Sequence, residues 1–447
     1  MAQAGRVKVE IGRAVGEPPV EEAEREALAV PPAARPTTLG GVRRRPLGMF
    51  DALQVRDFRL LWIGMIISNA GSWMQMIGQG WLVLQLTNSP FWLGMVAFAR
   101  AVPVLAFSLF AGAVADRVDR RRLLLVTQST AGVLALLLAV LTSTGVVRVW
   151  EIMAIAFLSA TTMAFDNPSR QALVPDMVGR DRLMNAVGLN SAAWNGAAVI
   201  GPSLAGVAIG VVGVAGCFYL NAASFLAVVW ALWAMRARGT GGRGRGTMWQ
   251  SIAAGLGYIA RHRVVLALFL IAAIPNLLGR PYQQLMPVFA RDVAHGGPRT
   301  YGLMMSASGA GALIGALLTA SLGAFRRKGL ILLAATAAFG LTLIAFALSR
   351  QLLLSVAILV LVGGCATMYM GAANTLLQVG VAPDFRGRIM SVYSMTAGGL
   401  MPLGGMLFGS AASLTRSVAL VVATGGAVVV CCAVAIGLAV PAVRAME

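Results

Sequence analysis

A run of charges between two long apolar segments constrains this chain more than any other feature of its sequence. Residues 116–122 read Asp-Arg-Val-Asp-Arg-Arg-Arg, and each flanking segment is long enough to cross a bilayer. Hydrocarbon cannot accommodate such a run. The run therefore predicts a short turn at a membrane surface between two spanning helices.

Gly112 and Asp116 stand four positions apart and therefore share one face of the helix that leads into this turn. Gly112 permits the close approach of another backbone. Asp116 closes the helix at its negative C-terminal end, where a carboxylate is unfavourable. We therefore expect Asp116 to have a partner, either a nearby arginine or the N-terminus of another helix.

The composition is that of a polytopic membrane protein. Of 447 residues, 58% are hydrophobic and 12% are charged, whereas soluble domains carry about 25% charged residues. The net charge of +19 does not indicate nucleic-acid binding, because the charges cluster in alternate loops. The four cysteines lie in apolar runs without metal-ligand spacing, and there are only two histidines. We expect no metal centre, no cofactor and no enzymatic activity.

The apolar runs predict an all-α membrane protein with twelve transmembrane helices in two pseudo-symmetric six-helix bundles. The fourth span is expected to run from Val149 to Asn167. Basic residues 43–45 would suit contact with anionic lipid. The predicted parts are a disordered cytoplasmic N-terminal tail (1–50), an N-terminal bundle (51–235), a cytoplasmic linker with an amphipathic helix (236–262) and a C-terminal bundle (263–447).

The loop charges predict the orientation. With the N-terminus inside, the cytoplasmic side holds 29 Lys and Arg residues and the outer loops hold 5. Because positive charge favours the cytoplasmic side, this asymmetry supports twelve spans with both termini in the cytoplasm. We expect the protein in the cell (inner) membrane of a bacterium, as a monomer.

The two halves repeat each other. Residues 173–180 (LVPDMVGR) match residues 381–388 (VAPDFRGR) at an offset of 208, and Gly94 and Gly302 share that offset. The basic turn recurs at 323–328 without the counterpart of its first acid. Two six-span halves related by an axis along the membrane normal explain these matches.

With these motifs, the chain resembles the major facilitator superfamily. Residues 112–121 follow the pattern Gly-x-x-x-Asp-Arg-x-x-Arg-Arg of its signature loop between spans two and three, although Asp119 occupies a position that is usually glycine. Residues 69–75, 79–84 and 167–175 are similar to the branch that contains the enterobactin exporter and related efflux proteins. The resemblance implies the major facilitator fold and transport by alternating access.

The resemblance also implies a cytoplasmic gate. Asp116 would meet the start of the eleventh span near Gly387–Ile389, and the positive end of that helix would suit the carboxylate. Arg117 and Arg121 would pair with nearby acids, Asp166 being the first choice. The candidate gate residues are Gly112, Asp116, Arg117, Arg121, Asp166, Gly387 and Arg388.

Polar side chains inside the spans are candidates for a substrate cavity, because such groups usually face a cavity or a partner. In the family, the first, fourth, seventh and tenth spans line the cavity. Hydrogen bonding between helices without ligand contact is the alternative for each residue. The candidates are Asn69, Trp73, Gln75, Gln79, Arg100, Asn190, Trp194, Asn276, Arg280, Gln283, Asn374 and Gln378.

Arg100 and Arg280 fall inside predicted spans, and no carboxylate is predicted at equal depth. An unpaired buried cation is costly, so each should face water, helix carbonyls or an anionic ligand. Proton coupling would need a titrating group, and Asp166 and Glu151 are the candidates, with Asp116 a third if the gate itself titrates.

The fifth span of each half carries a proline, Pro202 after Gly201 and then Pro402. Gly201-Pro202 resembles a helix-bend motif of exporters, and a plain helix kink is the alternative.

The predicted function is gradient-driven export of a small amphipathic or anionic molecule, such as a siderophore-like metabolite or a drug, with proton coupling. An importer or a lipid transporter of the same superfamily is the alternative, and a membrane enzyme or a transport-like receptor is less favoured.

Overall fold

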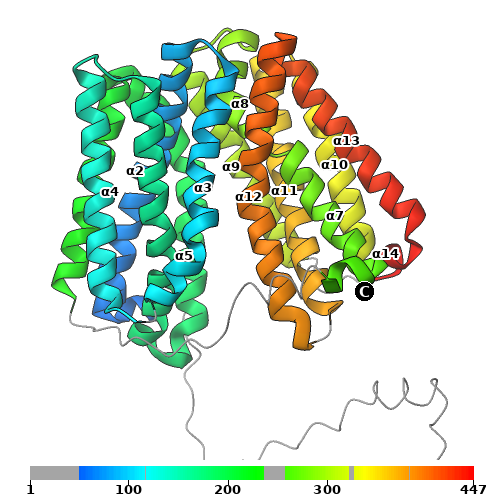
Figure 1. Cartoon of the computed structure of the whole chain (residues 1–447), viewed down its shortest axis with the longest axis horizontal. Coiled ribbons are helices and arrows are strands. Elements are labelled where there is room, and N and C mark those ends of the chain that lie inside the picture. Colours follow the sequence, from blue (N-terminus) through cyan, green and yellow to red (C-terminus); the bar gives the residue numbers. More distant parts are fainter. Residues whose placement is uncertain (1–49, 116, 236–256, 322–326, 382, 447) are drawn as a thin grey trace, which may run out of the picture. The chain divides into compact units, whose positions relative to one another are not determined.

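The computed structural model describes residues 50–115, 117–235, 257–321, 327–381 and 383–446, and within them every regular element is helical. The predicted tail up to residue 49 and linker residues 236–256 lie outside these ranges. The elements, drawn in Figure 1, are η1 (Asp51–Gln54), α2 (Arg56–Thr87), α3 (Pro90–Ala115), α4 (Arg120–Ser143), α5 (Val149–Ala234), α7 (Arg263–Leu278), α8 (Tyr282–Val288), η2 (Phe289–Val293), α9 (Pro298–Ser321), α10 (Lys328–Leu348), α11 (Leu352–Val379), α12 (Pro383–Thr415), α13 (Val418–Ala439) and α14 (Pro441–Ala445).

Ten helices of the described chain are long and apolar enough to cross a membrane. One of them, Asp181–Ala234, has 54 residues, and a continuous helix of that length would extend for about 80 Å, far beyond the bilayer. It is interrupted at Gly213, whose φ of 74° lies in the left-handed region that glycine tolerates. This segment therefore contains two helices.

The fourth predicted span was too short. The helix that begins at Val149 does not end at Asn167 but continues to Gly179, where φ is 73°. Pro168 and Pro175 lie inside it, because neighbouring helices can compensate for the backbone hydrogen bonds that proline removes. Asp166 consequently lies within a long helix instead of near a helix end.

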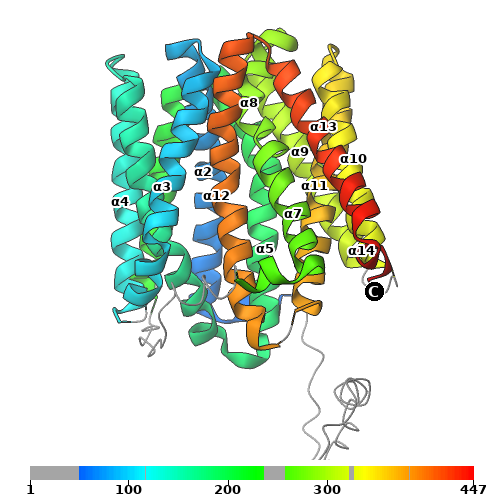
Figure 2. The same cartoon turned by 45° about the vertical axis from the view of Figure 1, so that its right-hand side comes forward.

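The helices of each half pack mainly on one another. In the first half, α2, α3 and α4 pack along α5; in the second half, α9 packs on α11 and α10 on α13 (Figures 1 and 2). Two extensive contacts join the halves, α3 with α12 and α5 with α9. We call the end of the helices where η1 and α14 lie the tail end, and the opposite end the far end.

Glycines permit both contacts between the halves. A Cβ atom at Gly94 would lie 2.4 Å from the carbonyl oxygen of Gly405, and one at Gly302 would lie 2.4 Å from that of Pro202. The sequence repeat relates Gly94 to Gly302, so equivalent glycines make equivalent contacts with the opposite half. Both contacts lie near the far end, where the backbone N–H of Phe91 also donates to the Ser413 hydroxyl (3.1 Å). The halves are therefore in contact at the far end.

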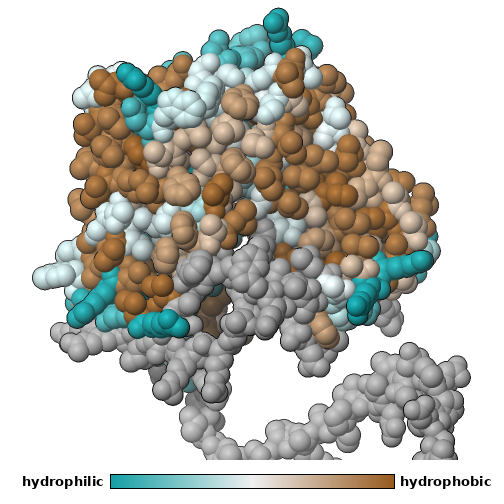
Figure 3. Space-filling model, viewed as in Figure 1, coloured by the Kyte–Doolittle hydropathy of each residue, from teal (hydrophilic) through white to brown (hydrophobic). Residues whose placement is uncertain are grey.

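Figure 3 shows hydrophobic residues across the middle of the visible face and hydrophilic residues gathered near its two ends. Large apolar side chains such as Val126, Leu226 and Leu353 are exposed. Such a surface suits surrounding lipid, and it would be unusual for a protein in water.

Candidate functional site: a polar cavity in the first half

The basic turn begins α4 at the tail end of the first half. Asp119 is the N-cap of α4, and its Oδ1 accepts hydrogen bonds from the backbone N–H groups of Arg121 (2.9 Å) and Arg122 (3.2 Å). The backbone φ of Asp119 is −56°, so the position does not require glycine. Asp119, which stands where the family pattern usually has glycine, therefore caps α4.

Two arginines of this turn, Arg120 and Arg121, connect α4 to α5. The Nη1 atom of Arg120 lies 2.7 Å from Oδ2 of Asp176. Arg121 donates to the carbonyl oxygens of Leu232 (2.6 Å) and Trp233 (2.8 Å), at the end of α5. A basic side chain at the negative end of a helix is favourable.

The expected pairing of Arg117 and Arg121 with Asp166 is not formed. Arg121 has the carbonyl partners given above, Arg117 is exposed, and Asp166 pairs with a different arginine. Asp116, the side chain of Arg388 and the surroundings of Gly112 and Gly387 lie outside what the structure describes. The gate at the start of α12 thus stays a prediction.

Asp166 is 4% exposed and makes three interactions. Its Oδ2 lies 2.8 Å from Nη2 of Arg170, one turn further along α5. Its Oδ1 accepts from Nε2 of Gln128 (2.6 Å) and from the hydroxyl of Thr127 (3.2 Å), both on α4. These interactions give both oxygens of the buried carboxylate a partner.

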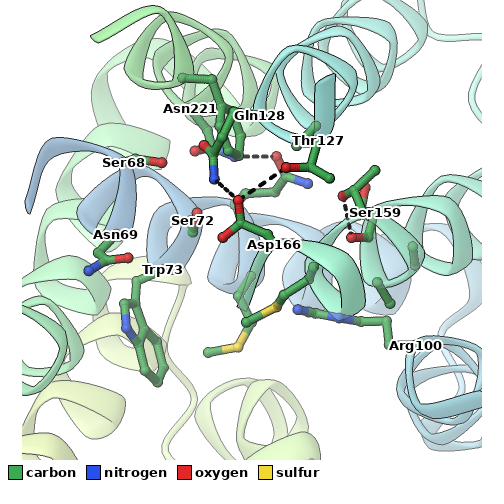
Figure 4. A pocket seen from close by; sticks show the side chains of 18 of the residues that line it. Ser68, Asn69, Ser72, Trp73, Arg100, Thr127, Gln128, Ser159, Asp166 and Asn221 are labelled. Atoms are coloured by element: carbon green, nitrogen blue, oxygen red, sulfur yellow. Dashed lines mark hydrogen bonds between the residues drawn. The ribbon is translucent and has the colours of Figure 1, made fainter. Parts of the chain in front are cut away.

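A cavity of about 330 Å³ surrounds this ion pair and lies among α2, α3, α4 and α5 (Figure 4). Seven sequence-predicted residues line it: Asn69, Trp73, Gln75, Gln79, Arg100, Asp166 and Trp194. The remaining lining residues include polar side chains that the sequence reasoning missed: Ser68, Ser72, Thr127, Gln128, Ser159, Thr162, Arg170 and Asn221. These could have been noticed as polar positions in apolar helices, but those on α4 and near the end of α5 fall outside the spans that the family pattern favours.

The cavity has one wall of amides and one of aromatic rings. Nδ2 of Asn221 donates to Oε1 of Gln75 (2.6 Å), which connects α5 to α2. The rings of Trp73 and Trp194 lie with centroids 6.2 Å apart. Figure 4 shows Trp73 and Arg100 on opposite sides of the view, with Asp166 between and above them. The arrangement combines fixed charge, hydrogen-bonding groups and an aromatic surface, as ligand pockets usually do.

The other predicted cavity residues do not line this cavity. Asn190 lies on α5 with a buried Oδ1 that has no partner in the described structure. Asn276 is fully buried, and its Oδ1 accepts from Nη1 of Arg280 (3.3 Å). Gln283 donates to the Tyr282 hydroxyl (3.5 Å).

Two further pairs also lie elsewhere. Gln378 donates to Asn374 (2.8 Å) one turn away on the same helix. Glu151 caps the start of α5 by accepting from the backbone N–H of Arg148. For these residues the observed partners are those of a structural role.

The predicted bend residues lie in continuous helix. Gly201 and Pro202 are inside α5, and Pro402 is inside α12. A Cβ atom at Gly201 would lie 2.5 Å from Cβ of Trp73, so this glycine permits the close packing of α5 on α2 beside the cavity. Their role as a bend in transport stays a prediction.

The helical fold and the internal polar cavity define a class, a polytopic membrane transporter, and comparison with known proteins gives the family. A family described as "Transmembrane secretion effector" matches residues 47–447, and the chain belongs to this family of the major facilitator superfamily, in its efflux-type branch.

The chain is 26% identical to the staphyloferrin A transporter of Staphylococcus aureus, over 75% of this chain and 85% of that one. It is also 26% identical to the multidrug efflux pump Tap of Mycolicibacterium fortuitum, over 78% and 88% of the two chains. Among solved structures, a POT family transporter in complex with 5-aminolevulinic acid has a TM-score of 0.71 at 12% identity, covering 89% of this chain and 98% of that one. That likeness concerns the fold alone.

Proposed function

We propose that this protein is a secondary active transporter that exports a small amphipathic or anionic molecule by alternating access. The observation that carries the proposal is the polar cavity around Asp166 and Arg170, inside a helical membrane fold. Relatives named as a siderophore transporter and as a multidrug efflux pump support a small-molecule substrate.

The proposed topology has twelve spans, with both termini in the cytoplasm of a bacterial cell and with the chain acting as a monomer. Three spans come from α5, because Gly179 and Gly213 divide it, and one comes from α7, α8 and η2 together. In this orientation the far end faces outward. The contacts of Gly94 and Gly302 with the opposite half then close the outer side.

In this proposal Asp116 and the start of α12 form the cytoplasmic gate. The gate contact would close the cytoplasmic side when the far-end contacts separate. The two ends would then open in alternation, which is the requirement for transport without a continuous pore.

Asp166 is the group that we propose for proton coupling. It is a buried carboxylate that lines the cavity, whereas Glu151 caps a helix end outside the cavity. Protonation of Asp166 would remove its ion pair and release Arg170, so the proton state would change the cavity itself.

The direct test is a substrate-panel efflux assay in a host that lacks its own pumps. Cells that express the chain should accumulate less of at least one anionic or amphipathic compound than cells that carry the empty vector. Equal accumulation for every compound, or greater accumulation in cells that express the wild type, would argue against export.

A further inference from the structure

The cavity contains hydrogen-bond donors that have no acceptor. Nδ2 of Asn69, Nε1 of Trp73 and Nε2 of Gln79 are buried atoms without a partner in the described structure, and all three residues line the cavity. Arg100 lines it too, and no hydrogen bond or ion pair of its guanidinium is found in the part of the chain that the structure describes. All four donors belong to α2 and α3.

Two of these four donors do not depend on how the amide groups are oriented, and among the residues that line the cavity one buried acceptor, Oε1 of Gln128, also lacks a partner in the described structure. The Trp73 indole N–H and the Arg100 guanidinium can only donate hydrogen bonds. A buried donor without an acceptor is unfavourable, and the half-buried guanidinium of Arg100 also lacks a counter-charge in the described structure. Something that accepts hydrogen bonds and carries negative charge would satisfy them.

No carboxylate that lines the cavity is free to do so. Asp166 is held by Arg170, Gln128 and Thr127, so its two oxygens already have partners. Asp166 and Arg170 cancel in charge, and Arg100 leaves the cavity with a net charge of +1. A cationic ligand would add a second unbalanced positive charge, whereas an anion would balance the first.

The apolar lining indicates the rest of the ligand. Trp73 and Trp194 present an aromatic surface, and Met76, Met163 and Phe225 add apolar contacts. An aromatic or aliphatic portion of a ligand can pack there while its oxygens reach the donors.

We propose that the cavity binds an organic oxyanion with an apolar portion, its anionic group held by Arg100 and further oxygen acceptors held by Asn69, Trp73 and Gln79. This names the substrate class of the proposed transporter and rests on that proposed function. A soluble carboxylate and a lipid phosphate share this chemistry, so the test includes both.

The test uses the purified full chain and a matched series of radiolabelled probes in a scintillation proximity assay. The probes are 2-naphthoate, the neutral 2-naphthamide and the cationic 2-naphthylmethylamine, with a lysophosphatidic acid as the phosphate-bearing lipid. The wild type should bind naphthoate most tightly of the three naphthyl compounds. Tighter binding of the lysolipid than of naphthoate would assign the oxyanion to a lipid.

Three variants test whether Arg100 causes the preference for the anionic probe. Arg100→Gln should weaken naphthoate binding by about tenfold or more, as expected for loss of a charge partner in a pocket, and should change naphthamide binding little. Arg100→Lys, which keeps the charge, should retain the preference for the anion even if Arg100→Gln proves unstable. Arg280→Gln removes an arginine that lies outside the cavity and should change neither affinity.

A preference for the amine, an equal loss for naphthoate and naphthamide in Arg100→Gln, or binding of none of the probes would overturn the proposal. Failure of the proposed function looks different: anions would bind through Arg100, but no compound would be transported. Conversely, if neutral compounds were transported and Arg100→Gln had no effect, the proposed transport function would stand and the proposed anionic substrate would be wrong.

Discussion

The Oδ2 atom of Asp166 lies 2.8 Å from Nη2 of Arg170, and both residues belong to one face of α5 inside the cavity. The pair is nearly buried, so neither charge can be removed without consequence for the other. A carboxylate can take up a proton and thereby lose its charge, whereas a guanidinium keeps its charge in proteins, so the pair contains one member that can carry a coupled proton and one fixed charge.

Asp166→Asn should abolish transport driven by a pH gradient while leaving substrate exchange. The amide can still accept from Gln128 and Thr127, but it cannot release a proton. Proteoliposomes measure both reactions: uphill transport under an imposed gradient, and counterflow with substrate on both sides. Asp176→Asn is the matched control, since Asp176 also pairs with an arginine but does not line the cavity. Uphill transport by Asp166→Asn would exclude this carboxylate as the coupling group.

Asp116→Asn should insert normally and transport much more slowly, because the proposed gate needs a charge opposite the start of α12. Flux per molecule of protein in the membrane is the measurement. Asp119→Asn is the control in the same turn, since asparagine caps a helix about as well as aspartate. Normal flux of Asp116→Asn at normal expression would contradict the gate.

Asp119→Ala should destabilise the protein by about 1 kcal/mol, because two backbone N–H groups at the start of α4 lose their acceptor. Asp119→Asn should be close to the wild type, and Asp119→Gly should lose only a few tenths of a kcal/mol. Unfolding in detergent compares the three. If alanine is no worse than glycine, the capping interaction contributes little.

Gly94→Ala and Gly302→Ala should separate the halves at the far end and slow transport, because each new Cβ atom would lie 2.4 Å from a backbone oxygen of the opposite half. The backbone must move to relieve such a contact. Gly188→Ala is the control, since nothing lies within 4 Å of the position of its Cβ atom. Labelling of single cysteines placed at the far end should rise in both variants and stay unchanged in the control.

The sequence predicted those features that depend on local chemistry. The charge run between apolar segments predicts the turn before α4. The repeat relates Gly94 to Gly302 but does not predict that both make close contacts with the opposite half. Polar residues at helical spacing, such as Asn69 and Trp73, identify the α2 wall of the cavity. These predictions require only helix geometry, the thickness of a bilayer and the spacing of residues along the chain.

The sequence alone could not show where Asp166 and Arg170 lie along their helix, or which side chains from distant parts of the chain pair with each other. The sequence predicts that the fourth span ends at Asn167, which puts Asp166 at the end of that span and Arg170 beyond it. Because the helix continues to Gly179, both residues instead line the cavity. The bond between Gln75 and Asn221 joins residues 146 positions apart, and only tertiary packing determines it.

The unpaired charge of Arg100 has an electrical consequence for the proposed transport cycle. An exported monoanion would neutralise the cavity, so the loaded protein would carry little net charge across the membrane. The empty cavity would return with its positive charge. An inside-negative potential favours inward movement of that charge by up to about 2.3 kcal/mol per 100 mV. The membrane voltage would therefore act on the reset of the empty protein, and it would draw the cavity back to the side where the next molecule is collected.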